Sequence, residues 1–176
     1  PDETNVILGK ENRVLFGDGF ITDQLLGCKF RISVHSFYQI NPYQTAKLYT
    51  EAFKFASLSK GDVVADIYGG IGTIGILAAK QCKQVYGIEI VEEAVVDARK
   101  NAELNGIDNI QFEASDAKTA TAKWVKENRK IDVAFIDPPR KGCDMDTIDS
   151  LVQLSPDKIV YISCDPATFA RDLRLF

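Results

Sequence analysis

The spacing of apolar residues divides the chain into a regular second part and an irregular first part. From Gly61 onward, short apolar runs alternate with longer stretches in which apolar residues recur every three or four positions. Short runs of this kind predict buried strands, and the longer stretches predict amphipathic helices. The expected strands are residues 63–68, 84–90, 110–114, 132–136 and 158–162, and the expected helices are residues 71–80, 91–105, 119–128 and 145–154.

Repeated strand–helix units predict a particular fold class. Successive apolar strands joined by helices form a parallel sheet with right-handed crossovers, covered by helices on both faces. We therefore expect an α/β fold with a doubly wound, mostly parallel sheet of the Rossmann-like type. A further helical pattern begins at Pro166, directly behind the fifth strand.

The first part of the chain has a different pattern. Apolar residues on both sides of Gly17-Asp18-Gly19 predict a β-hairpin with a glycine-rich turn, and residues 29–34 alternate like a half-buried strand. We expect residues 1–34 to form a small β appendage that is part of a central domain, followed by the main domain at 35–176. A helix is expected at 42–56, because Asn41-Pro42 supplies a capping side chain and a proline at the first helical position.

Composition narrows the range of functions. The 176 residues are 45% hydrophobic and 26% charged, which is typical of one globular domain, and the net charge is −4. No region has the basic character of a free-standing nucleic-acid binder, so such a partner would be held locally or by another domain. The scattered cysteines and the single histidine argue against a metal site in this segment and favour a reducing, cytoplasmic setting. Neither a membrane span nor a signal peptide is visible.

A glycine-rich segment follows the first strand of the regular part. Residues 66–75, D-I-Y-G-G-I-G-T-I-G, let the backbone pass close to a ligand and lead into a helix whose N-terminus offers free N–H groups. Glu89 ends the next strand, where a carboxylate can bind ribose hydroxyls. These features fit either a nicotinamide dinucleotide or S-adenosylmethionine. Asp66 favours S-adenosylmethionine, because a carboxylate suits the cationic amino-acid end of that ligand. The helix expected at 42–56, ahead of the first strand, favours it as well. A tight turn without a ligand is the structural alternative.

Polar residues also end the third and fourth strands. Asp116 can accept a hydrogen bond from an adenine amino group or can cap the next helix, and the sequence favours neither. The pair Pro138-Pro139 fixes the backbone so that Asp137 points into a cleft, an arrangement typical of methyltransferases acting on planar nitrogen or ring carbon. The basic pair at 140–141 can hold a phosphate or can be solvated surface.

Two cysteines differ in what their positions suggest. Cys164 follows the fifth strand and precedes Pro166, which places its thiol at the carboxyl edge of the sheet, where ligands bind in open α/β folds. A small buried hydrophobic residue is an equal alternative on position alone. Cys143 lies in a loop, and we expect it to be structural rather than a second reactive thiol.

Four blocks that occur in one order carry a family resemblance. They are S-F-Y-Q-I-N-P at 36–42, D-I-Y-G-G-I-G at 66–72, D-P-P-R-K-G at 137–142 and S-C-D-P-A-T at 163–168. Together they resemble the S-adenosylmethionine-dependent RNA uracil-5 methyltransferases, which make 5-methyluridine in ribosomal and transfer RNA. The likeness runs from about Asn5 onward. Its specific part is S-C-D-P-A-T combined with D-P-P-R.

The resemblance implies a cofactor, a substrate and a set of site residues. The cofactor is S-adenosylmethionine, and the substrate is a uridine in RNA, with ribosomal RNA favoured over transfer RNA. Cys164 is the nucleophile that adds to uracil C6, which makes C5 reactive enough to take a methyl group. Arg140 is expected to contact the substrate. The expected cofactor-binding residues are Gln39, Tyr68, Gly70, Gly72, Thr73, Glu89, Asp116 and Asp137.

The chain also departs from the family pattern. The 176 residues contain neither the family's N-terminal RNA-binding β-barrel nor its final strands, which carry the glutamate that removes the C5 proton. We therefore expect a C-terminally truncated catalytic domain that binds cofactor without turnover, with its fifth strand left as an exposed edge.

Three other functions fit parts of the sequence. Methylation of an exocyclic amine through Asp137-Pro138-Pro139 would leave Cys164 without a role. An NAD-dependent oxidoreductase is disfavoured, because no tyrosine–lysine pair or histidine stands out as a partner for hydride transfer. An inactive cofactor-binding module is the third alternative.

Overall fold

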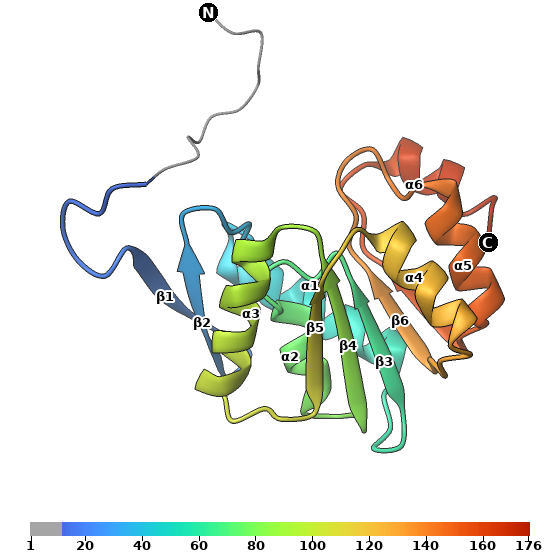
Figure 1. Ribbon diagram of the computed structural model, residues 1–176, viewed down its shortest axis with the longest axis horizontal. Coiled ribbons are helices and arrows are strands. Elements are labelled where there is room, and N and C mark those ends of the chain that lie inside the picture. Colours follow the sequence, from blue (N-terminus) through green and yellow to red (C-terminus); the bar gives the residue numbers. More distant parts are fainter. Residues whose placement is uncertain (1–11) are drawn as a thin grey trace, which may run out of the picture.

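The computed structural model describes residues 12–176, and its main body is a five-stranded parallel sheet between two layers of helices (Figure 1). The predicted doubly wound α/β fold is therefore confirmed. The strands are β3 (Val63–Ile67), β4 (Gln84–Glu89), β5 (Ile110–Ala114), β6 (Val133–Ile136) and β7 (Lys158–Tyr161). The helices are α1 (Pro42–Ala56), α2 (Thr73–Ala79), α3 (Glu92–Leu104), α4 (Ala117–Lys126), α5 (Met145–Leu154) and α6 (Pro166–Asp172).

The order of the strands reverses at the centre of the sheet, which is where doubly wound folds have a ligand-binding crevice. The order is β5-β4-β3-β6-β7, so the chain builds outward from β3 and then returns to add β6 on the other side. Ile67 is in register with both Ile88 and Ile136, and Ile136 with Tyr161. The carboxyl ends of neighbouring strands are thus level, and ligands bind at such reversal points in doubly wound sheets.

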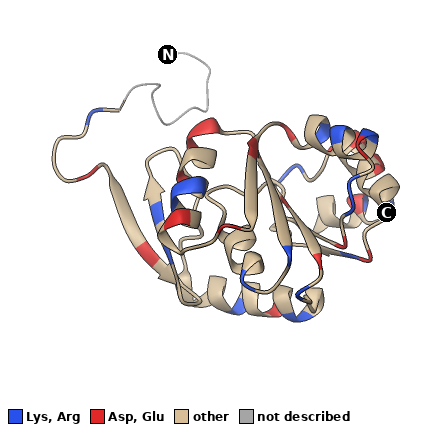
Figure 2. Cartoon of the chain, turned by 60° about the horizontal axis from the view of Figure 1, so that its bottom comes forward, with Lys and Arg blue, Asp and Glu red and all other residues tan. Residues whose placement is uncertain are grey.

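Both faces of the sheet are buried. Val64 and Phe135 belong to an apolar cluster with α1, α2 and α3, whereas Ala65 and Ile136 belong to a second cluster with α4 and α5. Alternate residues of one strand therefore reach opposite faces, which explains why the strands are apolar throughout. Figure 2 shows acidic and basic residues spread over the helices, strands and loops.

The hairpin in the first part of the chain lies later than predicted. β1 (Phe20–Leu25) pairs antiparallel with β2 (Cys28–Ser33) around Leu26-Gly27, so the predicted turn at 17–19 is wrong. Both turn residues have positive φ, 47° and 78°, as a two-residue hairpin loop requires. The observed register also buries Leu25, Cys28 and Phe30 against the main core, a gain that the local sequence pattern does not reveal. The strand expected at 29–34 is confirmed as β2.

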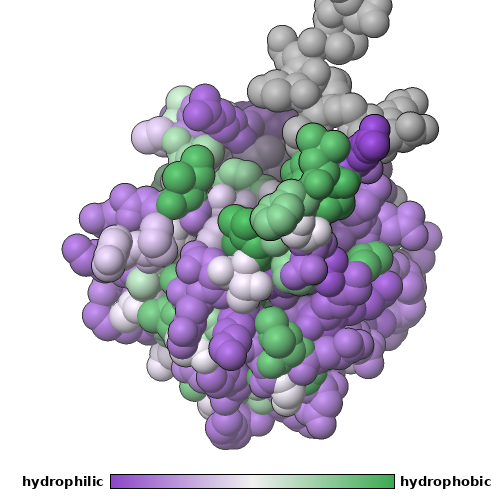
Figure 3. Space-filling model, turned by 90° about the vertical axis from the view of Figure 1, so that its left-hand side faces the viewer, coloured by the Kyte–Doolittle hydropathy of each residue, from purple (hydrophilic) through white to green (hydrophobic). Residues whose placement is uncertain are grey.

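The appendage expected at residues 1–34 is only partly described. Its first eleven residues lie outside the described part of the chain, and the division at residue 35 stays a prediction. Figure 3 views the molecule from the hairpin side and shows apolar side chains exposed among hydrophilic ones. Leu15, Phe16 and Ile21 are exposed in this region.

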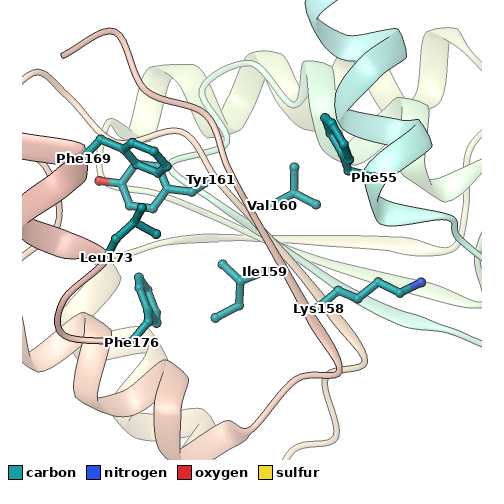
Figure 4. A pocket seen from close by; sticks show the side chains of 8 residues that line it. All are labelled: Phe55, Lys158, Ile159, Val160, Tyr161, Phe169, Leu173 and Phe176. Carbon is teal, nitrogen blue, oxygen red and sulfur yellow. The ribbon is translucent and has the colours of Figure 1, made fainter. Parts of the chain in front are cut away.

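An apolar groove runs along the outer strand β7. It has a volume of about 500 Å³ and lies between α1 and the C-terminal segment (Figure 4). Among the described residues, β7 has a strand partner only on its β6 side, as expected for an edge strand. The residues that line the groove are Phe55, Lys158, Ile159, Val160, Tyr161, Phe169, Leu173 and Phe176.

No helix within residues 12–176 is both long and apolar enough to cross a bilayer.

Candidate active site

The loop between β3 and α2 turns sharply over the centre of the sheet. Tyr68 has φ 67°, an uncommon conformation for a side-chain-bearing residue, and Gly70 and Gly72 have φ 54° and 83°. A Cβ atom at Gly72 would lie 2.7 Å from the Phe112 ring of β5, so packing against this strand also requires glycine there. At Gly70 the nearest atom to an added Cβ would be the Phe37 carbonyl oxygen at 3.8 Å, which places the 36–41 segment beside the loop.

Asp66 lies buried beneath this loop. Its Oδ2 accepts a hydrogen bond from the Gly75 amide at 2.8 Å, whereas its buried Oδ1 has no partner. Burial raises the pKa of Asp66 to about 7, with smaller contributions in the same direction from Asp137 and Glu89. A buried carboxylate oxygen without a donor is costly, so this site is suited to a positively charged or hydrogen-bond-donating ligand group.

Glu89 joins the ends of β3 and β4. Its Oε2 accepts from the Gly70 amide at 2.9 Å, and its Oε1 accepts from the Val91 amide at 2.8 Å. These bonds fix the carboxylate at the carboxyl edge of the sheet. Each oxygen retains acceptor capacity for a further donor, such as a hydroxyl group.

A tyrosine of α1 reaches the same region. The Tyr49 hydroxyl lies 3.5 Å from Thr73 Oγ1, and its ring is buried. Burial raises the pKa of Tyr49 to about 12, and the Asp137 and Asp66 carboxylates add to the rise while hydrogen bonds to Thr73 and Gln39 oppose it. Burial likewise raises the pKa of Asp137 to about 6. The predicted residues Gln39, Thr73 and Asp137 thus all affect the pKa of one tyrosine, and Thr73 lies within hydrogen-bond distance of its hydroxyl.

Two predicted cofactor residues have other contacts. Asp116 caps α4 by accepting from the Thr119 amide at 2.9 Å, as the structural alternative predicted, and hydrogen bonds with Thr119 lower its pKa. The ring of Tyr68 packs with the second apolar cluster. Burial and the neighbouring Cys143 thiol raise the pKa of Tyr68. A role of either residue in cofactor binding stays a prediction.

Cys164 lies exposed in the turn between β7 and α6. Asp165 caps α6 by accepting from the Ala167 and Thr168 amides at 2.9 and 3.0 Å. The Thr168 hydroxyl in turn donates to the Arg140 carbonyl at 3.1 Å, which ties this turn to the loop that follows Asp137. The exposed thiol rules out the alternative of a small buried hydrophobic residue.

A buried carboxylate holds α6 against the same loop. Asp172 Oδ2 accepts from the Cys143 amide at 2.8 Å and from the Tyr161 hydroxyl at 2.6 Å. Arg171 donates to the Lys141 carbonyl at 2.8 Å. Burial by itself would raise the pKa of Asp172, but the hydrogen bonds from Tyr161, the Cys143 amide and Arg171 lower it.

Cys143 and Arg140 lie in the loop between β6 and α5. Cys143 is buried, and burial raises the pKa of its thiol to about 11; its structural role stays a prediction. The Arg140 side chain is exposed, and its proposed contact with substrate remains a prediction. Within residues 12–176, no group of three or more histidine, cysteine or acidic side chains is arranged to hold a metal ion.

The chemistry of the crevice fits S-adenosylmethionine. The cofactor carries two positive charges, on its sulfonium and its ammonium group, and the crevice offers the carboxylates Asp66, Glu89 and Asp137. The partnerless Asp66 Oδ1 and the raised pKa values are what a cation-binding site would show before a cation neutralises it. The residues present therefore suit the cofactor that the sequence predicts.

The raised pKa of Asp66 predicts how the stability of the ligand-free chain depends on pH. Because its folded pKa of about 7 exceeds an unfolded value of about 3.9, the folded chain binds the extra proton, and this stability is lost as the pH rises through 7. Between pH 5 and 8 the loss should be on the order of 2–3 kcal/mol. Urea unfolding of wild type and Asp66→Asn at both pH values measures it. Parallel changes in the two proteins would contradict the assignment.

Sequence reasoning missed three residues of this region. Tyr49 occupies an apolar position in its helical pattern, so its hydroxyl gave no separate signal. Asn101 and Asp172 are fully buried polar residues, and polar residues on helices are normally taken to face solvent. Their position inside apolar stripes is the only signal that could have identified them.

Comparisons with known proteins agree with this arrangement. A family model described as tRNA (Uracil-5-)-methyltransferase matches residues 5–176. An RNA methyltransferase from Lactobacillus johnsonii is 51% identical over 176 residues, covering 100% of this chain and 39% of that protein. One from Halalkalibacterium halodurans is 49% identical over 175 residues, covering 99% of this chain and 38% of that protein. The chain thus spans about two fifths of these relatives.

A solved structure of similar sequence has the same fold. The crystal structure of Pyrococcus abyssi tRNA (uracil-54, C5)-methyltransferase in complex with S-adenosyl-L-homocysteine superimposes with a TM-score of 0.83 at 32% identity, covering 100% of this chain and 42% of that one. A methyltransferase from Agrobacterium tumefaciens, with a TM-score of 0.71 and 18% identity over 94% of this chain and 59% of that one, shares the fold. The chain belongs to the tRNA (uracil-5-)-methyltransferase family.

Proposed function

We propose that the chain contains the cofactor-binding and nucleophilic part of an S-adenosylmethionine-dependent enzyme that methylates C5 of a uridine in RNA. The observation that carries the proposal is the exposed Cys164 at the end of β7, tied through Thr168 to the loop that follows Asp137. Family membership supports the same function. Ribosomal RNA is our preferred substrate class, although the matching family model and the Pyrococcus relative are both described by transfer RNA.

The proposed chemistry requires a thiolate beside an electrophilic methyl group. S-adenosylmethionine supplies that methyl group on a sulfonium. The Cys164 sulfur forms a bond to uracil C6, and the electron pair of the C5–C6 double bond moves toward the C4 carbonyl as an enolate. C5 would then be nucleophilic enough to attack the methyl carbon, and the carbon–sulfur bond of the sulfonium would break to leave S-adenosylhomocysteine. Loss of the C5 proton to a base and departure of the sulfur restore the ring.

The proposed roles of the other residues follow from their chemistry. Asp66 and Asp137 provide negative charge for the cationic part of the cofactor, and Glu89 accepts from its ribose hydroxyls. Gln39, Thr73 and the glycines of the loop complete the cofactor site. The remaining proposed cofactor contacts are Tyr68 and Asp116, and Arg140 holds a phosphate of the RNA.

Methylation of an exocyclic amine is the second candidate, since Asp137-Pro138-Pro139 suits that chemistry as well. Such a reaction needs no thiol, so it gives no reason for an exposed cysteine at the edge of the sheet. Nucleoside analysis of RNA treated with the protein and radiolabelled cofactor separates the two. The proposal predicts label on C5 of uridine, as 5-methyluridine or in its covalent adduct with Cys164, and label in an N-methylated base would contradict it.

The same assay tests the prediction that these 176 residues do not turn over by themselves. They contain no residue that the family resemblance assigns to removal of the C5 proton. Labelled RNA should therefore not exceed the molar amount of protein. Several labelled uridines per protein molecule would contradict this prediction without affecting the proposed reaction.

A further inference from the structure

Three polar residues on one side of α3 and at its C-cap face the outer edge of β2. Asp97, Asn101 and Asn105 are spaced four residues apart, so they lie in one row along the helix. Four residues advance a helix by about 6 Å, and two residues advance a strand by about 6.8 Å. Side chains in such a row can therefore keep step with alternate residues of a neighbouring strand.

The hydrogen bonds between these side chains and β2 have this spacing. Asn105 accepts from the Lys29 amide at 2.9 Å and donates to the Lys29 carbonyl at 2.7 Å. Asn101 accepts from the Arg31 amide at 2.7 Å and donates to the Arg31 carbonyl at 3.1 Å. The helix thus supplies, through its side chains, the pairing that a third strand would give to the edge of β2.

Asn101 makes one contact that serves a different purpose. Its Nδ2 also donates to the Ile71 carbonyl at 3.1 Å, in the peptide segment between Gly70 and Gly72. Asn101 is fully buried, and all the donors and the acceptor of its amide are then engaged. A single side chain therefore links the hairpin, helix α3 and the glycine-rich loop.

Asp97 makes a comparable link to the other side of the crevice. Its Oδ2 accepts from the Ser33 amide at 3.1 Å and from the Ser36 hydroxyl at 3.0 Å. Ser36 begins the segment that leads to Gln39 and passes beside Gly70. Both segments of the proposed cofactor site are thus positioned from the same helix.

We propose that Asn101 is a positioning residue for the cofactor: it holds the Gly70–Gly72 loop in its binding conformation before the ligand arrives. Glycines gain the most freedom when a loop is released, so a fixed loop avoids an ordering cost on binding. The role rests on the proposed cofactor site. Because Asn101 anchors the glycine-rich loop to β2, the hairpin would also help to position the cofactor.

Asn105 offers a matched control for this role. It makes the same pair of bonds to β2, but its remaining bond goes to the Asn101 carbonyl of its own helix, and none reaches the glycine loop. Asn101→Ser and Asn105→Ser should both weaken the hairpin. Only Asn101→Ser should weaken S-adenosylhomocysteine binding, by about 10- to 100-fold, with Asn105→Ser within about twofold of wild type.

Two measurements on the 176-residue chain test the proposal. Calorimetric titration gives the dissociation constants well below the melting temperatures of the variants, and hydrogen exchange of the ligand-free chain reports the amides of residues 70–73. Faster exchange at 70–73 is expected in Asn101→Ser but not in Asn105→Ser. Unchanged affinity and unchanged exchange in Asn101→Ser would overturn the proposal.

A second variant isolates the donor. Asn101→Asp keeps an acceptor for the Arg31 amide but removes the Nδ2 donor to Ile71, so it should lose affinity as Asn101→Ser does. Wild-type affinity in Asn101→Asp would contradict the role. A wild-type chain that fails to bind S-adenosylhomocysteine would contradict the proposed cofactor site itself, and this role with it.

Discussion

Replacing Cys164 with alanine should lower methyl transfer to RNA by at least about 10³-fold, because uracil C5 is too weak a nucleophile without addition of a thiolate at C6. The affinity for S-adenosylhomocysteine should stay within about twofold of wild type. The cysteine is exposed, and the hydrogen bonds of its turn are made by Ser163, Asp165 and Thr168. Single-turnover transfer of a radiolabelled methyl group and calorimetry measure the two quantities.

Cys143 supplies the control for that experiment. Its thiol is buried in the second apolar cluster, so Cys143→Ala should lower stability by about 1–2 kcal/mol while methyl transfer persists. Substantial methyl transfer by Cys164→Ala would favour methylation of an amine. Loss of transfer in Cys143→Ala with retained stability would reassign the nucleophile.

Asp172→Ala should lower the free energy of unfolding by about 3–5 kcal/mol, the largest stability effect that we expect. The substitution leaves the Cys143 amide and the Tyr161 hydroxyl without their buried acceptor and removes the carboxylate beside Arg171. It also releases α6 from the loop at 140–143, so methyl transfer should fall as well. Urea denaturation measures the stability.

A surface aspartate gives the matched comparison. Asp149 is exposed on α5, and Asp149→Ala should change stability by no more than about 0.5 kcal/mol. A similar small change in Asp172→Ala would contradict the view that this carboxylate anchors α6.

The order of the elements could be predicted from the sequence because each strand is buried on both faces and each helix has one apolar side. Asn41 and Pro42 likewise mark the start of α1, which begins at the predicted residue. The hairpin could not be placed, because its register depends on burying Leu25, Cys28 and Phe30 against elements distant in the sequence. Local glycines marked a turn, but at the wrong position.

The candidate site shows the same division between local and long-range information. The residues at the strand ends could be predicted, because parallel strands bring their carboxyl ends to one edge. Cys164 was left open between two environments until its exposure was known. The bonds of Asn101 to Ile71 and of Asp172 to Cys143 join residues about thirty positions apart, and no periodicity signals such contacts.

The mass of the protein after incubation with S-adenosylmethionine and a short RNA containing 5-fluorouridine tests the central claim most directly. Fluorine at C5 cannot leave as a proton does, so the bond between sulfur and C6 should persist once it forms. We predict a covalent protein–RNA adduct that carries the transferred methyl group, maps to Cys164 after proteolysis and is absent in Cys164→Ala. RNA that is methylated at uridine C5 without any adduct at Cys164 would contradict the account.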